Sequence, residues 1–436
     1  MKTTATLLSL FFSSVISAQI VNIPDQNFKN ALISQGIDTN NDKEIQLSEA
    51  SKITILKVRS KSISDLTGIE AFENLDSLLC DSNSIAGLDL SKNSHLAALY
   101  CATNKIAKLN IANCKNLTAL SCSSNQLTEI DLSQNLNLTY LSININRLTN
   151  IDISKNINLM SLYCSVVSFN GYHINTLDIS NNPNLRILIF NGHHLKNLNT
   201  AGNPKLKYLS CNYNDITYLD LIKNPDLEYL YCSANELQHL DLVNNLKLRV
   251  LYCDANELTA TLNLSHNLNL QNVYCGTNSS LEAINVTNCK RLQKLNCFES
   301  NLTGTLDLSQ NDSLLELECQ LNFFLKYICV PDKTKAENNS NFSKDASALW
   351  MDGCVTEINE VAAAAQSIGL FYPNPASDLV TIGTDIQVFS IYNLFGQLVY
   401  QGSDSQISIA SLPNGIYNVV CITKHNSIIH QKLIKS

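Results

Sequence analysis

The chain has 436 residues, 45% hydrophobic and 16% charged, with a formal net charge of −8, which leaves room for about three ordinary domains or one long repeat array. The low charged fraction excludes a coiled coil, and the 65 leucines exclude a disordered chain. The acidic balance, without a run of Lys or Arg, argues against nucleic acid and anionic lipid as partners.

Residues 1–18 are predicted to be a secretory signal peptide. Lys2 supplies the positive charge, residues 7–16 form an apolar run, and Ile16-Ser17-Ala18 precedes the expected cleavage before Gln19. A run of about ten apolar residues is shorter than the ~20 that a membrane-spanning helix needs. We therefore expect an exported protein without a membrane span.

Residues 19–52 are expected to form a helical cap over the first repeat. Asp25 can cap a helix that buries Phe28, Ala31 and Leu32 on one side, and Gly36 is expected to end it. A repeat array has apolar ends, so a cap of this kind is required.

The loop that follows has the spacing of a calcium site. Asp38, Asn40, Asp42 and Glu49 stand at positions 1, 3, 5 and 12 of a segment that resembles the EF-hand loop, with Lys43 at position 6 where that family has Gly. The resemblance implies weak calcium binding as the single cofactor. A polar turn within the cap, with no cofactor, is the preferred interpretation, and the calcium site is the alternative.

Leucines recur between Leu75 and Leu314 in twelve units, with steps of 21 or 22 residues and one step of 26. One unit reads Leu117-x-x-Leu120-x-Cys122-x-x-Asn125-x-Leu127, which resembles a leucine-rich repeat. The segment 63–75 resembles the first repeats of internalin-like proteins. The resemblance implies a mainly β solenoid over residues 53–328. Each unit holds the pattern twice, so we expect two short strands per turn, one on each side.

Two asparagine positions per unit, represented by Asn125 and Asn135, predict two internal ladders that satisfy the backbone groups of the turns. Cys114 and Cys289 take the place of asparagine in the second ladder. We expect these side chains to be structural.

Ten cysteines occupy one inward position and are predicted to be reduced and buried, because parallel strands hold their Cβ atoms ~4.8 Å apart, too far for a disulfide. Cys421 is expected to point inward on a late strand. Cys329 and Cys354 lie outside the ladder, and we predict that they form a disulfide that closes the C-terminal cap, within residues 329–366. The ten are Cys80, Cys101, Cys122, Cys164, Cys211, Cys232, Cys253, Cys275, Cys297 and Cys319.

Outward positions supply the candidate ligand site. Five tyrosines are expected to be exposed on one strand face and to bind a ligand; cross-strand packing is the alternative. They are Tyr208, Tyr229, Tyr231, Tyr252 and Tyr274.

Two polar columns leave alternatives open. Asp131 and its equivalents form an outward column, interpreted either as solvated repeat consensus or as a divalent-ion site. A second column is interpreted either as a polar edge or as a transition-metal site. Its members are His173, His194, Asp215, Glu236 and Glu257.

Residues 367–436 change character. They contain the segments Tyr372-Pro373-Asn374-Pro375, Ile391-Tyr392-Asn393, Gly415-Ile416-Tyr417 and Lys432-Leu433-Ile434-Lys435. Together these resemble the type A C-terminal sorting domain of the type IX secretion system. The resemblance implies a small β-sandwich, the type IX machinery as a partner, and a secreted or outer-surface location in a Gram-negative bacterium.

The sequence thus predicts a secreted or cell-surface binding protein that recognises a protein or a glycan through an extended strand face. A structural surface or adhesion component without a single ligand is the alternative. A hydrolytic or metal-dependent enzyme is the third reading, since the sequence has none of the common catalytic motifs.

Overall fold

The computed structural model describes residues 19–166, 171–353, 371–372, 378–382, 386–393, 398–424 and 428–435. The chain divides into two units, residues 1–353 and residues 354–436, and each is described by itself. Among the described residues, no helix has the length and apolar character needed to cross a membrane.

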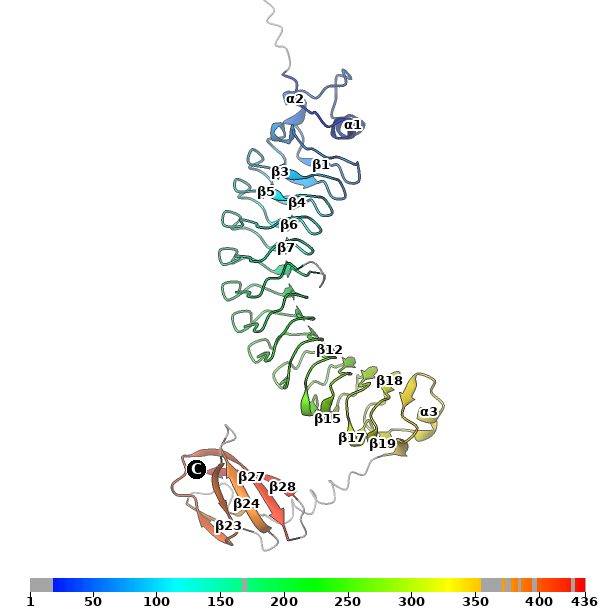
Figure 1. Ribbon diagram of the computed structural model, residues 1–436. Helices are drawn as coiled ribbons and strands as arrows, with labels where there is room; N and C mark the ends of the chain where they lie inside the picture. The colour runs from blue at the N-terminus through cyan, green and yellow to red at the C-terminus, as the bar shows by residue number, and fades with distance from the viewer. Residues whose placement is uncertain are drawn as a thin grey trace, which may run out of the picture. The chain divides into compact units, whose positions relative to one another are not determined.

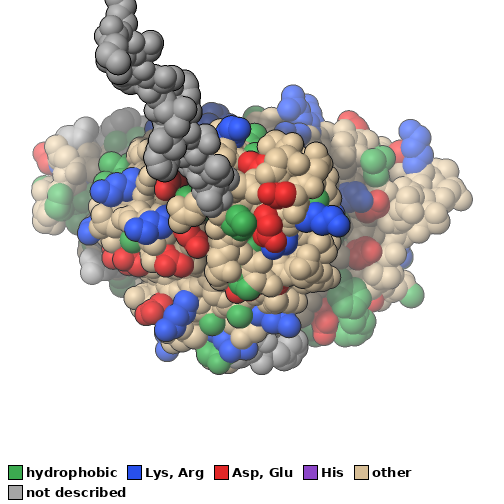
Figure 2. Space-filling view, turned by 90° about the horizontal axis from the view of Figure 1, so that it is seen from above, with side chains coloured by type: hydrophobic (Ala, Val, Ile, Leu, Met, Phe, Trp, Pro, Cys, Tyr) green, Lys and Arg blue, Asp and Glu red, His purple; other side chains and the backbone are tan. Residues whose placement is uncertain are grey.

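The first unit begins with the predicted helical cap. Helix α1 (Gln26–Ser34) starts at Asp25, whose carboxylate accepts a hydrogen bond from the Phe28 N–H at 2.9 Å. Phe28, Ala31 and Leu32 are buried as predicted. Helix α2 (Leu47–Ala50) completes the cap, and the short 3-10 helix η1 (Ile69–Ala71) lies in the first turn of the solenoid. Figure 2 looks down on this end, where acidic and basic side chains alternate and hydrophobic ones are scattered.

A fourteen-stranded parallel sheet, here called the long sheet, runs through the whole unit and lines the inner side of its curve (Figure 1). Twelve of its strands correspond to the twelve predicted units, and β1 and β20 add one strand at each end. The central residue of nearly every strand is a buried Leu or Val, which forms the core with the inward cysteines. In order the strands are β1 (Ile55–Lys57), β2 (Ser77–Leu79), β4 (Ala98–Tyr100), β6 (Ala119–Ser121), β7 (Tyr140–Ser142), β8 (Ser161–Tyr163), β9 (Ile187–Ile189), β10 (Tyr208–Ser210), β11 (Tyr229–Tyr231), β12 (Val250–Tyr252), β14 (Asn272–Tyr274), β16 (Lys294–Asn296), β18 (Glu316–Cys319) and β20 (Phe342–Lys344).

The opposite side of the solenoid, here called the second face, differs from the prediction. Its strands are β3 (Gly87–Asp89), β5 (Lys108–Asn110), β13 (Thr259–Asn263), β15 (Ser280–Asn285), β17 (Thr303–Asp307), β19 (Phe324–Val330) and β21 (Leu349–Asp352). Between β5 and β13 the described residues of this face form no strand, so the expectation of two strands in every turn was wrong there. Strands β13, β15 and β17 fall in the 22-residue steps, where register shifts beside Ala260 and Gly304 take up the extra residue.

The first asparagine ladder uses both ends of its amide. The Asn125 side chain accepts a hydrogen bond from the Ile106 N–H at 2.9 Å and donates to carbonyls of its own turn and the preceding turn. His193 replaces asparagine in one turn. Its Nδ1 accepts from the Ile174 N–H at 3.2 Å, and its Nε2 lies 2.9 Å from the Cys164 carbonyl oxygen.

The second ladder uses only the donor end. The Asn135 amide donates to the carbonyls of Ile111 and Cys114 at 3.1 and 2.9 Å, and its buried Oδ1 has no hydrogen-bond partner. Where Cys114 stands in this ladder, its thiol lies 3.5 and 3.6 Å from the carbonyl oxygens of Leu90 and Asn93.

The cysteines follow the prediction. The ten ladder cysteines, Cys114, Cys289 and Cys421 are all free and buried. Burial raises the pKa of Cys122 and of Cys211 to about 12, so these thiols stay protonated at neutral pH.

The C-terminal cap contains helix α3 (Lys333–Glu337), which begins at Asp332, and the buried Trp350 on β21. Cys329 is disulfide-bonded. Its predicted partner, Cys354, lies outside the described residues, so the pairing stays a prediction.

The described residues of the second unit form seven strands in two antiparallel sheets, in the orders β22-β23-β26 and β25-β24-β27-β28. Phe389, Val419 and Leu433 belong to its own apolar core, in agreement with the predicted small β-sandwich. The strands are β22 (Phe371–Tyr372), β23 (Leu379–Ile382), β24 (Ile386–Tyr392), β25 (Leu398–Gly402), β26 (Gln406–Ser408), β27 (Gly415–Thr423) and β28 (Ile428–Lys435).

Candidate functional site

The five tyrosines identified from the sequence lie together on β10, β11, β12 and β14, and we call them the tyrosine band. Tyr231, Tyr252 and Tyr274 occupy paired positions on adjacent strands, with ring centroids 5.0 and 4.2 Å apart and interplanar angles of 29° and 15°. Tyr208 stacks on Tyr231 at 5.2 Å and lies 5.7 Å from Tyr229. The rings therefore form one continuous stack across four strands.

Because the rings cover one another, all five are half-buried rather than exposed as expected. Burial raises the pKa of Tyr208 and of Tyr252 to about 12, and the neighbouring tyrosine adds to both shifts. These two hydroxyls are thus neutral at physiological pH, and each is hydrogen-bonded to a neighbouring tyrosine, Tyr208 to Tyr231 and Tyr252 to Tyr274. The stacked faces are occupied by neighbouring rings, which leaves the ring edges and hydroxyls as the accessible groups.

The aromatic surface extends further than the sequence reasoning placed it. Tyr140 and Tyr163 form a ring pair at 5.5 Å on β7 and β8. Half-buried Ile187 and Ile189 on β9 connect this pair to Tyr208. The strand positions are the same as those of the tyrosine band, because Tyr140 is in register with Tyr208 through Ser161 and Ile187.

Charged groups border the tyrosine band on both sides. The Arg249 guanidinium lies 6.0 Å from the centre of the Tyr229 ring. Asp254, beside Tyr252, accepts hydrogen bonds from the Ser233 hydroxyl at 3.0 Å and the Gly276 N–H at 3.2 Å. Burial raises the pKa of Asp254, although these hydrogen bonds lower it in part.

The predicted calcium loop folds as a tight turn. Asp38 accepts hydrogen bonds from the N–H groups of Asp42 and Lys43 at 3.2 and 3.0 Å, and the Asn40 side chain accepts from the Asp42 N–H at 2.9 Å. Lys43 has φ 67°, the left-handed conformation that Gly adopts freely. The departure at this position does not prevent the loop conformation.

Glu49 faces the same loop from α2. Its Oε1 accepts hydrogen bonds from the Thr39 N–H and hydroxyl at 2.7 and 2.6 Å, and its Oε2 accepts from the Gln46 N–H at 3.0 Å. Burial raises the pKa of Glu49, but these hydrogen bonds outweigh it and hold the pKa below the usual range. In the described ranges, no group of three or more His, Cys, Asp or Glu side chains is arranged to hold a metal ion. Calcium binding stays a prediction.

The histidine column forms a paired polar edge. The rings of His173 and His194 lie 4.5 Å apart, and the His194 Nδ1 lies 3.1 Å from an Asp215 carboxylate oxygen. The His173 Nδ1 lies 2.9 Å from the Gly192 carbonyl oxygen. Each of these imidazoles therefore already has a partner, which favours the polar edge over the metal site.

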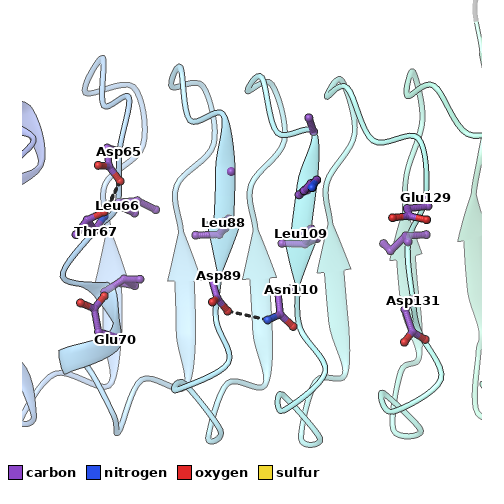
Figure 3. Close-up of a pocket in the computed structure, with 15 residues that line it drawn as sticks. Asp65, Leu66, Thr67, Glu70, Leu88, Asp89, Leu109, Asn110, Glu129 and Asp131 are labelled. Carbon is purple, nitrogen blue, oxygen red and sulfur yellow. Dashed lines mark hydrogen bonds between the residues drawn. The ribbon is translucent and has the colours of Figure 1, made fainter.

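The outward aspartate column caps the turns of the second face. Asp131 accepts a hydrogen bond from the Ser133 N–H at 2.8 Å, and its equivalents in other turns accept in the same way. Near the N-terminus the column borders a groove of about 730 Å³, where Asn110 donates to Asp89 at 2.9 Å (Figure 3). This local role explains the repeated Asp without a bound ion.

The C-terminal unit is similar to a known family. Residues 370–436 match the family described as the secretion system C-terminal sorting domain. The chain therefore carries a type IX sorting domain and is secreted to the cell surface. No curated protein sequence matches the chain.

Two solved structures from Listeria monocytogenes resemble the fold. The functional domain of InlJ, which includes a cysteine ladder, is 24% identical, with 96% of this chain and 100% of that chain covered and a TM-score of 0.57. The internalin InlF is 18% identical, with 76% of this chain and 98% of that chain covered and a TM-score of 0.53. The solenoid therefore has the leucine-rich-repeat fold of internalins.

Proposed function

We propose that this secreted leucine-rich-repeat protein binds a protein ligand at the cell surface, with the tyrosine band at the centre of the contact. The supporting observation is the continuous ring stack on four adjacent strands. The repeat does not require it, because the same outward position holds Ser121, Asn296 and Glu318 in other turns. The apolar surface therefore serves something other than the stacking of turns.

The stack suits a binding contact on energetic grounds. Tyrosine provides apolar area together with a hydroxyl donor, and it is enriched among the residues that dominate protein interfaces. The rings are already ordered by one another, so little side-chain freedom is lost when a ligand docks. A pre-ordered surface of this kind favours affinity.

The geometry favours a protein over a glycan. A sugar ring packs against the open face of an aromatic ring, whereas most faces in the tyrosine band are covered by the next ring. The accessible edges and hydroxyls, bordered by Arg249 and Asp254, match the mixture of apolar, donor and acceptor groups on a polypeptide surface.

The test compares two variants of residues 19–436 in pull-downs from surface-protein fractions, followed by a titration of the captured protein. We expect the triple substitution Tyr229→Ala, Tyr231→Ala and Tyr252→Ala to weaken binding at least tenfold. This corresponds to the loss of one strong interface residue, at about 1.4 kcal/mol per tenfold change.

The matched control is Leu79→Ala with Tyr100→Ala, which truncates the same outward column several turns away. It should bind as the unmodified protein does. If the triple variant keeps its fold and its affinity, the ligand site lies elsewhere. Uniform weak adhesion to every surface tested would instead support the structural alternative.

A further inference from the structure

The turns that lead from the second face back to the long sheet form one edge of the solenoid, which we call the basic flank. It carries eight of the 30 Lys and Arg of the chain and two of its 38 Asp and Glu, and the outward aspartate column borders it on the second face, with Asp131 and Asp152 near Lys155. One of the two acids on the flank itself, Asp226, is paired with Lys247 at 2.5 Å. The flank comprises residues 92–95, 113–116, 134–137, 155–158, 181–184, 202–205, 223–226, 244–247, 266–269, 288–291 and 310–313.

A row of apolar side chains runs along the middle of this flank at one position of seven successive turns. Leu136, Ile157, Leu246 and Leu268 are 50, 54, 53 and 53% exposed. Three exposed prolines fill the turns between them. At ~4.8 Å per turn the row is roughly 30 Å long. We call it the apolar row: Leu136, Ile157, Pro183, Pro204, Pro225, Leu246 and Leu268.

The repeat does not demand apolar residues here. The same position holds Ser94, Lys115, Lys290 and Asp312 in the outer turns. The backbone of the row is held in register by side-chain amides of the following turns, since Asn158 donates to the Leu136 carbonyl and Asn269 to the Leu246 carbonyl, at 3.2 and 2.9 Å. The row is thus a fixed ridge of exposed aliphatic groups.

The opposite edge of the solenoid, here called the acidic flank, has the reverse charge. Its described turn segments carry six Asp or Glu, including Asp215, Glu236 and Glu257, and four basic residues, which are Arg59, Lys61, Lys105 and Arg147. The excess of cations on the basic flank is therefore a local property in a chain whose net charge is −8.

We propose that the basic flank binds the surface of an anionic lipid membrane. The apolar row lies at the level of the lipid headgroups, and lysines such as Lys155, Lys205 and Lys223 face the lipid phosphates. An exposed apolar strip with basic residues beside it is the arrangement by which interfacial proteins hold such surfaces. This site is separate from the tyrosine band.

The experiment measures co-sedimentation of residues 19–436 with phosphatidylcholine vesicles, with and without phosphatidylglycerol. We expect binding to the vesicles that contain phosphatidylglycerol, at least tenfold weaker binding to pure phosphatidylcholine, and weakening as salt rises. The row variant replaces Leu136, Ile157, Leu246 and Leu268 with Ser and should lose at least tenfold in binding. Its fold should survive, because polar residues already occupy this position in the outer turns.

Two further variants make the result specific. Replacing Lys155, Lys205 and Lys223 with Gln should also weaken binding at least tenfold. Tyr213→Ser with Tyr218→Ser removes two side chains that are 66 and 64% exposed and lie outside the basic flank, and it should bind as the unmodified chain does.

Three outcomes would overturn the proposal. One is that the unmodified chain does not sediment with phosphatidylglycerol vesicles. Another is a dimer that the row variant converts to a monomer, which would make the row an interface between copies. Binding that depends on the lysines but is unchanged in the row variant would indicate a polyanion site without lipid insertion. The binding of a protein ligand by the tyrosine band is assayed separately and does not depend on these results.

Discussion

The two asparagine ladders run through the same turns but satisfy the backbone in different ways. In the first ladder the Asn125 amide both donates and accepts. In the second ladder eight asparagines, including Asn135, donate to two carbonyls but leave a buried Oδ1 without a partner. The first position therefore requires a donor and an acceptor, whereas the second requires only a donor.

The natural substitutions agree with this difference. Cysteine, a weak donor, replaces asparagine in the second ladder at Cys114 and Cys289, where each thiol contacts carbonyl oxygens. In the first ladder the substitute His193 has both a donor and an acceptor nitrogen, and the Ser300 hydroxyl donates to the Cys275 carbonyl. The difference between the ladders can be tested by placing the residue type that replaces Asn in one ladder at an Asn position of the other.

The largest effect is expected for Asn125→Cys. It leaves the Ile106 N–H and at least one carbonyl unpaired in the interior, at a cost of about 4 kcal/mol in the free energy of unfolding. The matched change in the other ladder, Asn135→Cys, should cost less than about 1.5 kcal/mol, because a thiol serves that position elsewhere. Urea denaturation of both variants measures the two losses in the free energy of unfolding. Equal losses would show that the ladders do not differ.

The next effect is a pH dependence in the first ladder. Burial lowers the pKa of His193 to about 4, although the hydrogen bond to Cys164 raises it in part, against about 6.5 in the unfolded chain. The neutral ring is thus favoured on folding. As the pH falls from about 6.5 to about 4, only the unfolded chain gains this proton, and stability decreases by up to about 3 kcal/mol.

The control for this pH effect is His193→Asn, which restores the usual residue of the ladder. Thermal melts of both proteins across this pH range should diverge as the solution is acidified, with the variant less affected. Parallel curves would show that His193 does not titrate in this way.

A smaller effect is expected at Thr200, a core position beside the second ladder. Its hydroxyl donates to the Asn224 Oδ1 at 2.7 Å, so it supplies the partner that the other asparagines of this ladder lack. Thr200→Val should cost only about 1 kcal/mol, because an unpaired Oδ1 is tolerated in eight other turns. A loss as large as that of Asn125→Cys would mean that the acceptor matters in both ladders.

The smallest change in stability is expected from calcium binding at the N-terminal cap. There the Asp38 carboxylate already accepts hydrogen bonds from two backbone N–H groups, just as the Asn side chains of the first ladder accept from backbone N–H groups. At ~5 mM calcium and an affinity in the millimolar class, the ion should add no more than about 1 kcal/mol. The check is the melting temperature with calcium or chelator, with Asp42→Asn as the control. An identical melting temperature with calcium and with chelator would show that the cap does not bind calcium.

Sequence periodicity predicted most of this architecture, because one residue per turn falls in each column. The leucine core, both ladders and the free cysteines of the Cys122 column follow directly from the repeat. The missing second-face strands did not follow, since the half-repeat specifies burial but not strand pairing. The half-burial of Tyr231 and Tyr252 was also missed, because stacking depends on rotamers that the spacing does not encode.

The basic flank is a second feature that the sequence did not predict. No run of Lys or Arg exists along the sequence, and from this we expected no affinity for anionic lipid. Residues such as Lys155, Lys205 and Lys223 are far apart in the chain, but the solenoid places them on nearby turns of one edge. Charge in a repeat protein has to be counted by column rather than along the sequence.

The ten ladder cysteines make the lifetime of the folded protein depend on local separation of its turns. The ten thiols are shielded only while neighbouring turns are stacked, and local opening in oxidising surroundings exposes several of them at once. Burial holds the pKa of Cys122 at about 12, whereas an unfolded cysteine ionises near ~8.5 and reacts. A molecule oxidised in the open state cannot restack its turns. Survival at the cell surface follows the rate of opening where oxidation is faster than reclosing, and the equilibrium population of the open state where reclosing is faster.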